Sequence, residues 1–484
     1  MFVRFLKTLY HICWYGVAGL IILAAISITL FRMALPDIGH YREDIQIWIS
    51  DYMGYPVQIR SINASWEGWV PNLYLQDISV INEDSNEPLI RFDQASITLD
   101  PVSSLKQREF IPYDITVSGV DLSLIRHQDG SISLVRADAA AQTPDAGAGK
   151  NELGRWFRKQ KHIEIDKVDI QWIDHHDKLS PVLFSNASIR IHSDGDRMQI
   201  SGSAHADQDL SGTDIEFALD IHGHLHTSEW SGDIYINADN VNPRFWSDHF
   251  KLDTVELDNG GGQLQIWSQW ERARLVKLDG LVSWESLHVN GYPLNGINGQ
   301  VHITRNRNDD WLANIEMREF TTATGIWPGL AAEITLPSGK TSTDRYIHAS
   351  VDYLKIEDLT DMLGRYGIMD LLEPDKATLS GELFNTQLKL SVDDEVDYIW
   401  VDSDFSHLTL RRPDHYSVAD LSGHITIDNN SRIIHIESEK SRLLLPEYYR
   451  DPLWFYNLNG DITWKNHSNG FEIRIDSLNG KTSD

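Results

Sequence analysis

Three histidines occupy alternate positions in the segment Ile-His-Gly-His-Leu-His that ends at His226. Residues two positions apart on a β-strand share a face, so the imidazoles of His222, His224 and His226 could converge on one zinc ion and leave a coordination position open for water. A zinc hydrolase is therefore one hypothesis. The apolar neighbours in this segment mark the opposite, dry face, so solvated histidines are the simpler interpretation. We expect neither a metal nor another cofactor.

Two segments resemble the end of a phosphate-binding loop, Ser-Gly-Lys-Thr at residues 338–341 and Asn-Gly-Lys-Thr at residues 479–482. That loop requires a further glycine five residues before its final glycine, because backbone amides must approach the phosphates. Ile334 and Ile475 occupy the two required positions. The sequence also has no Gly-x-Ser-x-Gly motif, which would present a nucleophilic serine on a strained turn. We therefore predict that the protein is not an enzyme.

The composition excludes several further classes of protein. The 484 residues carry a net charge of −29, and so acidic a surface is repelled by phosphate backbones, which argues against nucleic acid as a partner. Cys13 is the only cysteine, so the chain has no disulfide and no thiolate cluster for zinc or iron–sulfur. The 16 tryptophans are mostly scattered, which favours structural packing over a carbohydrate-binding platform.

Residues 12–30 contain no charged side chain and predict a transmembrane helix. A helix rises about 1.5 Å per residue, so a run of this length covers the roughly 30 Å hydrocarbon core of a bilayer. Arg4 and Lys7 precede the span and acidic residues follow it closely, which favours a cytoplasmic tail at residues 1–11 and an exported body. The positions that represent the span are Ile12, Gly16, Leu20, Leu23, Ile26 and Leu30.

Residues 31–54 predict a short amphipathic helix. Asp37 can cap it, and Gly54 followed by Pro56 ends it. Its apolar face is formed by Ile38, Tyr41, Ile45, Trp48, Ile49 and Tyr52. Two interpretations remain open: the helix lies at the outer leaflet as an interfacial helix, or it packs on the body that follows.

From Val57 onward the sequence alternates apolar and polar residues over short stretches, which is typical of strands with one dry and one wet face. Turn signals separate these stretches, and they are Asp129-Gly130, Asp194-Gly195, Asn259-Gly260, Asn290-Gly291, Asn459-Gly460 and Asn479-Gly480. Their spacing of roughly ten to fifteen residues predicts a mainly β, antiparallel body of about thirty to forty short strands.

Two segments interrupt this pattern. Residues 137–162 begin with small, polar and helix-breaking residues and predict a flexible linker with a short helix. Apolar residues at helical spacing predict another helix over residues 356–372. The body is thereby divided into a first β unit at 55–136 and a continuation at 163–484. Alternation alone does not distinguish a string of sandwiches from one continuous sheet that curls into a trough.

The order of several short motifs behind the predicted membrane span resembles a known family. The motifs are Gly-Tyr-Pro-Val-Gln-Ile at 54–59, Trp-Glu-Gly-Trp-Val-Pro-Asn-Leu-Tyr-Leu at 66–75, Ala-Ser-Ile-Thr-Leu at 95–99 and Ile-Thr-Val-Ser-Gly-Val-Asp-Leu at 115–122. They resemble the AsmA-like proteins of Gram-negative envelopes, and most closely the N-terminal part of the YhdP group. Members of that group are much longer, so the chain is expected to be a fragment or a shortened relative.

The resemblance implies an elongated, curled antiparallel sheet with an apolar groove, anchored in the inner membrane with its body in the periplasm. It also implies a lipid-transfer function, in which the groove shields phospholipid acyl chains between the inner and outer membranes. The alternative is a periplasmic scaffold for outer-membrane assembly that acts through protein partners. The candidate groove residues are Leu73, Leu75, Ile97, Leu99, Leu122, Leu124, Ile170, Trp172, Phe217, Leu219, Ile234, Ile236, Leu264 and Ile266.

Overall fold

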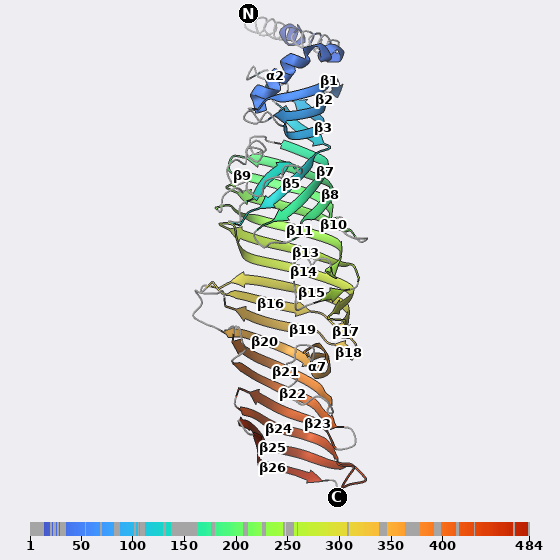
Figure 1. Ribbon diagram of the computed structural model, residues 1–484, viewed down its shortest axis with the longest axis vertical. Coiled ribbons are helices and arrows are strands. Elements are labelled where there is room, and N and C mark those ends of the chain that lie inside the picture. Colours follow the sequence, from blue (N-terminus) through green and yellow to red (C-terminus); the bar gives the residue numbers. More distant parts are fainter. Residues whose placement is uncertain are drawn as a thin grey trace, which may run out of the picture. The chain divides into compact units, whose positions relative to one another are not determined.

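The structure is a computed structural model and is mainly β (Figure 1). It describes residues 14–19, 22, 26, 29, 35–53, 55–67, 70–81, 88–100, 103–104, 106, 112–128, 132–136, 162–175, 180–206, 212–224, 229–244, 247, 256–258, 260–306, 309–337, 346–363, 378–391, 398–412, 416–429, 431–467 and 470–482. Backbone contacts divide the chain into two units. The first unit comprises residues 1–208 and 216–230, and the second comprises residues 209–215 and 231–484.

The first unit begins with two helical segments followed by strands. They are η1 (Leu35–Tyr41), α2 (Arg42–Met53), β1 (Val57–Glu67), β2 (Val70–Ile81), β3 (Pro88–Leu99), β4 (Pro112–Ser118), β5 (Asp121–Arg126), β6 (Ile132–Arg136), β7 (His162–Asp174), β8 (Val182–Asp194) and β9 (Arg197–Ala206). β10 (Thr213–His222) pairs with β9 and has residues in both units.

Most pairing in the first unit is antiparallel between neighbours in the chain, as predicted. β7 is the exception, because it pairs in parallel with β4 through its first half and with β5 through its second half. Gly119, with a φ of 68°, lies between β4 and β5. The sheet is thus mainly antiparallel, as predicted, and the parallel pairing of β7 was not foreseen, since alternation shows a strand's faces but not its direction.

Helix α2 lies along the outer edge of β1 and supplies the hydrogen bonds that a neighbouring strand would make. The side chains of Gln46 and Ser50 accept the backbone N–H groups of Ile59 and Val57, at 3.2 and 3.0 Å. Residues four apart on a helix lie on one face, which aligns these two side chains with the strand. The helix thereby covers a sheet edge that would otherwise be open to pairing with another strand.

The apolar side of α2 packs against the hydrophobic core of the first unit. Ile49 is 4% exposed and Ile45 and Trp48 pack beside it, whereas Ile47 on the other side of the helix is 60% exposed. Of the two interpretations of the predicted helix, packing on the body is the one that the structure shows. Its relation to a membrane stays a prediction.

The second unit consists of strands and one short helix. They are β11 (Ser231–Val241), β12 (Leu257–Asp258), β13 (Gly262–Glu271), β14 (Arg274–Val289), β15 (Tyr292–Arg305), β16 (Trp311–Met317), β17 (Phe320–Thr322), β18 (Gly325–Trp327), β19 (Leu330–Leu336), β20 (Tyr346–Lys355), α7 (Ile356–Leu363), β21 (Thr378–Ser391), β22 (Ile399–Arg412), β23 (Tyr416–Ile427), β24 (Ser431–Leu444), β25 (Leu453–His467) and β26 (Gly470–Thr482).

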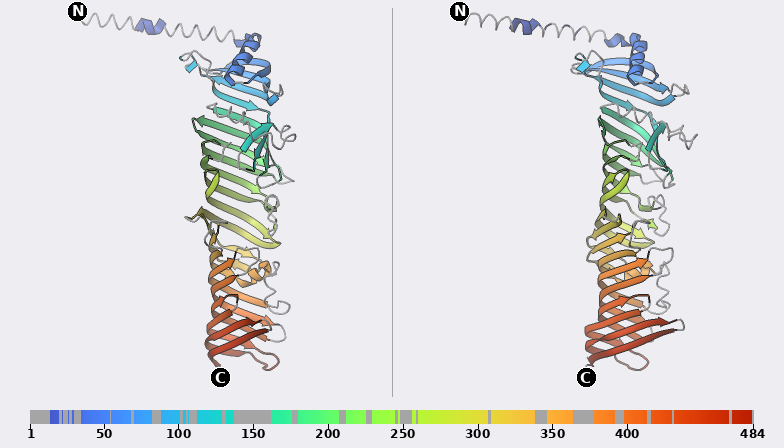
Figure 2. Two further views of the ribbon diagram at one scale, coloured as in Figure 1. Left: turned by 60° about the vertical axis from the view of Figure 1, so that its left-hand side comes forward. Right: turned by 90° about the vertical axis from the view of Figure 1, so that its left-hand side faces the viewer.

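From β13 to β26 the strands of this unit follow one another as antiparallel neighbours, as the two further views also show (Figure 2). β11 pairs with β13, and the short β12 pairs with the end of β14. The β17–β18 hairpin is a side branch: β17 pairs with one end of β15, while β16 and β19 pair directly with each other. Figure 1 shows β17, β18 and α7 together beside the ends of the longer strands.

Many strands contain one residue in the left-handed conformation, and the pairing register shifts at most of these residues, though not at Asp77. Such residues with φ between 50° and 60° are Asp77, Lys167, Asn186, Asn240, Asn385, His407, Asp420, Asn457 and Ser477. Each bulge reverses the alternation of side chains along its strand. In β7, for example, Ile163 and Ile165 are buried before Lys167, and Val168 and Ile170 are buried after it.

The bulges explain two predictions that were wrong. The described residues form 26 strands, mostly of 10–16 residues, rather than thirty to forty short ones, because a strand with reversed alternation reads as two. Asn459-Gly460 and Asn479-Gly480 lie inside β25 and β26 and form no turn, since the bulges at Asn457 and Ser477 account for the local breaks. Turns at Gly195 and Gly291 are confirmed.

The predicted helix over residues 356–372 and the predicted linker lie partly or almost wholly outside the described residues. Helix α7 confirms the first half of the helix predicted over residues 356–372, and residues 364–372 lie outside the described residues. The same holds for the linker, whose residues 137–161 are not described. β4 and β5, which precede that segment, pair with β7, which follows it, so both sides belong to the first unit.

Candidate functional site

The register of the second unit brings apolar side chains into one continuous set of cross-strand neighbours, which we call the apolar face. One row runs through Ile236, Ile266, Gly280, Val301, Ile315, Ala332 and Val351. A second row, two residues along, runs through Ile334, Ala349, Leu388, Val401 and Ile427. A third runs through Ile425, Ile434, Ile462 and Ile475. Residues directly opposite each other in a sheet share a face, so this apolar surface extends across the unit.

These side chains are only partly removed from water. Gly280 is buried and Ile475 is 58% exposed, but every other member of the apolar face is half-buried. An ordinary sandwich would bury this face against a second sheet. A partly exposed apolar surface of this extent is typical of a binding surface.

The first unit differs, because its apolar residues form a closed core. Val57, Ile90, Ile163 and Val168 are at most 2% exposed. A cavity of about 50 Å³ lies among α2 and β2–β4, with Ile49, Leu75 and Ile97 in its wall.

The structure therefore separates the predicted groove residues into two groups. Buried members of the first unit's core are Leu73, Leu75, Ile97, Leu99, Leu122 and Ile170. Half-buried members are Leu124, Trp172, Phe217, Leu219, Ile234, Ile236, Leu264 and Ile266, of which the last four lie on the apolar face of the second unit. The register pairs Ile236 directly with Ile266, and Ile234 and Leu264 lie two residues along their strands on the same face.

One part of the apolar face is covered by the protein itself. Phe320 and Trp327 of the β17–β18 hairpin, each 6% exposed, form a cluster with Tyr353 and Ile297. Trp284, Met317 and Leu330 of the apolar side pack against it. The rings of Phe320 and Trp327 stack at 5.2 Å between centroids, and Tyr353 meets Trp327 edge-on at 5.5 Å. Burial, aided by a hydrogen bond to Glu382, raises the pKa of Tyr353 to about 12.

A buried carboxylate holds this hairpin to helix α7. Asp358 is fully buried in the first turn of α7 and accepts hydrogen bonds from Tyr292, Thr322, Thr324 and Trp327. Burial alone would raise the pKa of Asp358, but the four donors outweigh it and the pKa lies below its usual value. Sequence reasoning missed Asp358, because nothing near it in the chain marks it as buried.

The opposite face of the second unit is polar and contains histidine–carboxylate pairs. His302 contacts Asp279, and His435 lies 2.7 Å from Asp461. His424 approaches two carboxylates, with Nδ1 2.9 Å from Asp404 and Nε2 2.6 Å from Asp402. Carboxylates only accept hydrogen bonds when ionised, so both contacts are satisfied by the protonated imidazolium. The hydrogen bond to Asp404 raises the pKa of His424, although burial opposes this.

The candidate catalytic motifs have no support in the described residues. His222 and His224 are exposed, His226 lies outside the description, and no group of three or more possible ligands is placed to hold a metal in the part of the chain that is described. Residues 338–341 are likewise outside it. Residues 479–482 belong to β26 rather than to a phosphate-binding loop.

The predicted membrane span is only partly described. Gly16 and Ile26 are helical, whereas Ile12, Leu20, Leu23 and Leu30 lie outside the described residues. Among the described residues, no helix has the length and hydropathy needed to cross a bilayer.

The model of one protein family, described as YhdP protein, matches residues 1–484. The chain belongs to the YhdP family. This confirms the resemblance found in the sequence. A curated member, the intermembrane phospholipid transporter YhdP of Escherichia coli (strain K12), is 20% identical over an alignment that covers 94% of this chain and 36% of that relative. The chain thus spans about a third of the relative's length. The relative is named as a transporter and not as an enzyme, in agreement with our prediction of no enzymatic activity. No solved structure matches the chain.

Proposed function

We propose that this protein is a lipid-transfer protein, anchored in the inner membrane with its body in the periplasm, that shields phospholipid acyl chains on the apolar face of the second unit during transfer between the two membranes. The observation that carries the proposal is the half-buried state of that face across successive strands from β11 to β26. The name of the family's E. coli member supports the choice of phospholipid as the cargo.

The free energy of acyl-chain hydration explains why such a face is useful. Each methylene moved into water costs about 0.8 kcal/mol, so two sixteen-carbon chains cost on the order of 25 kcal/mol when fully hydrated. An apolar surface removes most of that cost while the headgroup stays in water. Because hydrophobic contacts are non-directional, a lipid can move along the surface without breaking specific bonds.

Two glycines on the apolar side of the sheet let large aromatic rings pack close to the backbone. A Cβ on Gly262 would lie 2.0 Å from the ring of Trp284, so this tryptophan lies directly over the glycine opposite it. Gly423 likewise faces the ring of Phe405, whose Cζ would lie 2.9 Å from an added Cβ. Both rings therefore lie close to the sheet instead of standing out from it.

Lipids bound to the full chain test the proposal when they are counted by mass spectrometry after isolation without detergent. Ile315→Asp puts a charge on the apolar face, and Asn314→Asp puts the same charge on the polar face one residue away. We expect phospholipid on the unaltered protein and on Asn314→Asp, and a loss on Ile315→Asp. An unaltered protein that is free of phospholipid would refute lipid transfer and direct attention to protein partners.

A further inference from the structure

An arginine lies on the apolar face near the edge of the second unit at which β15 and β25 end and β16 and β24 begin. We call this edge the lip. Arg432 in β24 is directly paired with Trp464 in β25, and the neighbouring pair on the same face is Ile434 with Ile462. The guanidinium carbon of Arg432 lies 5.5 Å from the centre of the Trp464 ring. Arginine stacks on aromatic rings because its weakly hydrated, planar cation is attracted by their electron-rich faces.

Part of this guanidinium is buried without a partner. Nη1 of Arg432 is shielded from solvent and forms no hydrogen bond with any residue that the structure describes. An unpaired, desolvated donor carries a cost that an acceptor supplied by a ligand would remove. The donor therefore favours an anionic group bound at this place on the apolar side.

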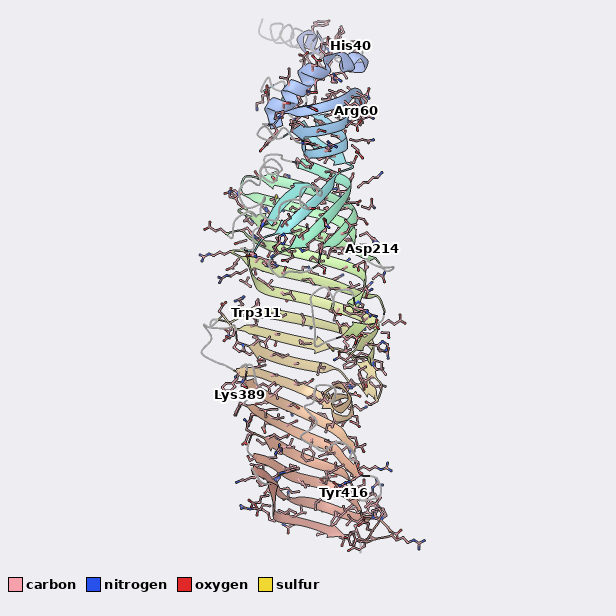
Figure 3. The ribbon with its side chains drawn as sticks, viewed as in Figure 1. His40, Arg60, Asp214, Trp311, Lys389 and Tyr416 are labelled. Carbon is pink, nitrogen blue, oxygen red and sulfur yellow. The ribbon has the colours of Figure 1, made fainter. Side chains whose placement is uncertain are left out.

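A second pair of the same kind shows what a satisfied arginine looks like here. The guanidinium carbon of Arg305 lies 4.2 Å from the centre of the Trp311 ring. Because the strands alternate in direction, the ends of β15 and β25 and the starts of β16 and β24 lie on one edge of the unit, so both pairs lie along the same lip. Figure 3 labels Trp311 on this lip. Arg305 donates to Asp309 at 2.6 Å and to the carbonyl of Leu275 at 3.2 Å. The guanidinium of Arg305 thus has acceptors within the protein, whereas Nη1 of Arg432 has none among the described residues.

We propose that Arg432 and Trp464 bind the phosphodiester headgroup of a phospholipid whose acyl chains lie against Ile434 and Ile462. This deepens the proposed function and rests on it. The guanidinium gives charge-assisted hydrogen bonds to phosphate oxygens, and the aromatic ring orients it. The chain has a net charge of −29, so an arginine on the apolar side provides a local positive charge that favours an anionic headgroup.

The test compares two lipids that share their acyl chains. The full chain, kept soluble in an amphipathic polymer, is incubated with dipalmitoyl phosphatidylglycerol or with dipalmitoylglycerol, which lacks the phosphate, and the bound lipid is measured by mass spectrometry. We expect the unaltered protein to prefer the phospholipid by about tenfold, the effect of one charge-assisted hydrogen bond. Arg432→Gln should lose this preference, and Arg432→Lys should keep part of it because charge remains without the planar fork.

Arg474→Gln is the matched control. Arg474 lies one strand away in β26, opposite Thr463 on the polar face, and is exposed. This variant should keep the full preference. A preference that survives Arg432→Gln overturns the headgroup site alone and leaves lipid transfer standing. Absence of both lipids from the unaltered protein overturns both proposals.

Discussion

Removal of the Asp358 carboxylate should release the β17–β18 hairpin from helix α7. Four donors converge on this fully buried group, with Thr322 and Thr324 at 2.8 and 2.5 Å and with Tyr292 and Trp327 completing the set. Asp358→Ala deletes the acceptor for all four and leaves the indole N–H of Trp327 with no partner in this cluster. Asp358→Asn keeps the size of the side chain and one carbonyl oxygen.

The expected magnitudes follow from the hydrogen bonds lost. A hydrogen bond to a charged group is worth about 1.5–3 kcal/mol, and leaving buried donors unpaired raises the loss for Asp358→Ala to about 3–5 kcal/mol. Asp358→Asn should cost about 1–2 kcal/mol, because the hydroxyls of Tyr292 and Thr324 can rotate to accept from the amide while Trp327 keeps its acceptor. The order of stability is therefore Asp, then Asn, then Ala.

Hydrogen exchange measured by mass spectrometry is the suitable assay, because it reports local opening in a long chain of strands. Peptides that cover residues 320–327 and 356–363 should lose protection by about two to three and a half powers of ten in Asp358→Ala, at roughly 1.4 kcal/mol for each power. Peptides from β24 and β25 serve as the internal control. Unchanged exchange at residues 320–327 in Asp358→Ala would refute the role assigned to this carboxylate. Because the pKa of Asp358 is lowered by folding, its stabilisation is present above the unfolded pKa and should be lost as the pH falls through the folded value.

Three further outcomes are expected. Ile49→Asp should lower the free energy of unfolding by about 3–5 kcal/mol, detach α2 and expose it to limited proteolysis. Ile47→Asp, on the exposed side of the helix, should be cleaved like the unaltered protein, and equal cleavage of the two variants would contradict the packing. Gly262→Ala should lower the unfolding midpoint, and Trp284→Leu in the same chain should restore part of it; no recovery would contradict direct contact. Folding raises the pKa of His424, so the loss caused by His424→Gln in urea unfolding should be full below the unfolded histidine pKa of about 6.5 and should disappear as the pH rises through the raised folded value. A loss that grows with pH would contradict the ion pairs.

The sequence predicted the strands well because alternation of apolar and polar residues is a local property. It could not predict where alternation reverses. Lys167 and Ser477 adopt the left-handed conformation although neither residue type marks it in a sequence, so the face of every later residue in the strand was undetermined. The parallel pairing of β7 depends on contacts across a long separation in the chain and has no local signal either.

The sequence predicted an apolar surface, but it could not predict which residues form that surface. Leu122 and Ile266 both lie in segments of alternating apolar and polar residues, yet Leu122 is 3% exposed in a closed core and Ile266 is half-buried on the apolar face. The difference arises from what packs over each strand, which alternation does not encode. Asp358 and Arg432 could not be found for a related reason, since a buried carboxylate or an unpaired guanidinium is defined by partners far away in the sequence.

The central claim is that acyl chains lie on the apolar face of the second unit. Photo-crosslinking in living cells with phosphorus-32-labelled lipids tests it directly, using benzoylphenylalanine in place of Ile315 on that face or of Glu316, the next residue, on the polar face. We expect labelled lipid joined to the protein when the probe is at position 315 and none when it is at position 316. Equal labelling at both positions, or labelling at 316 alone, would contradict it.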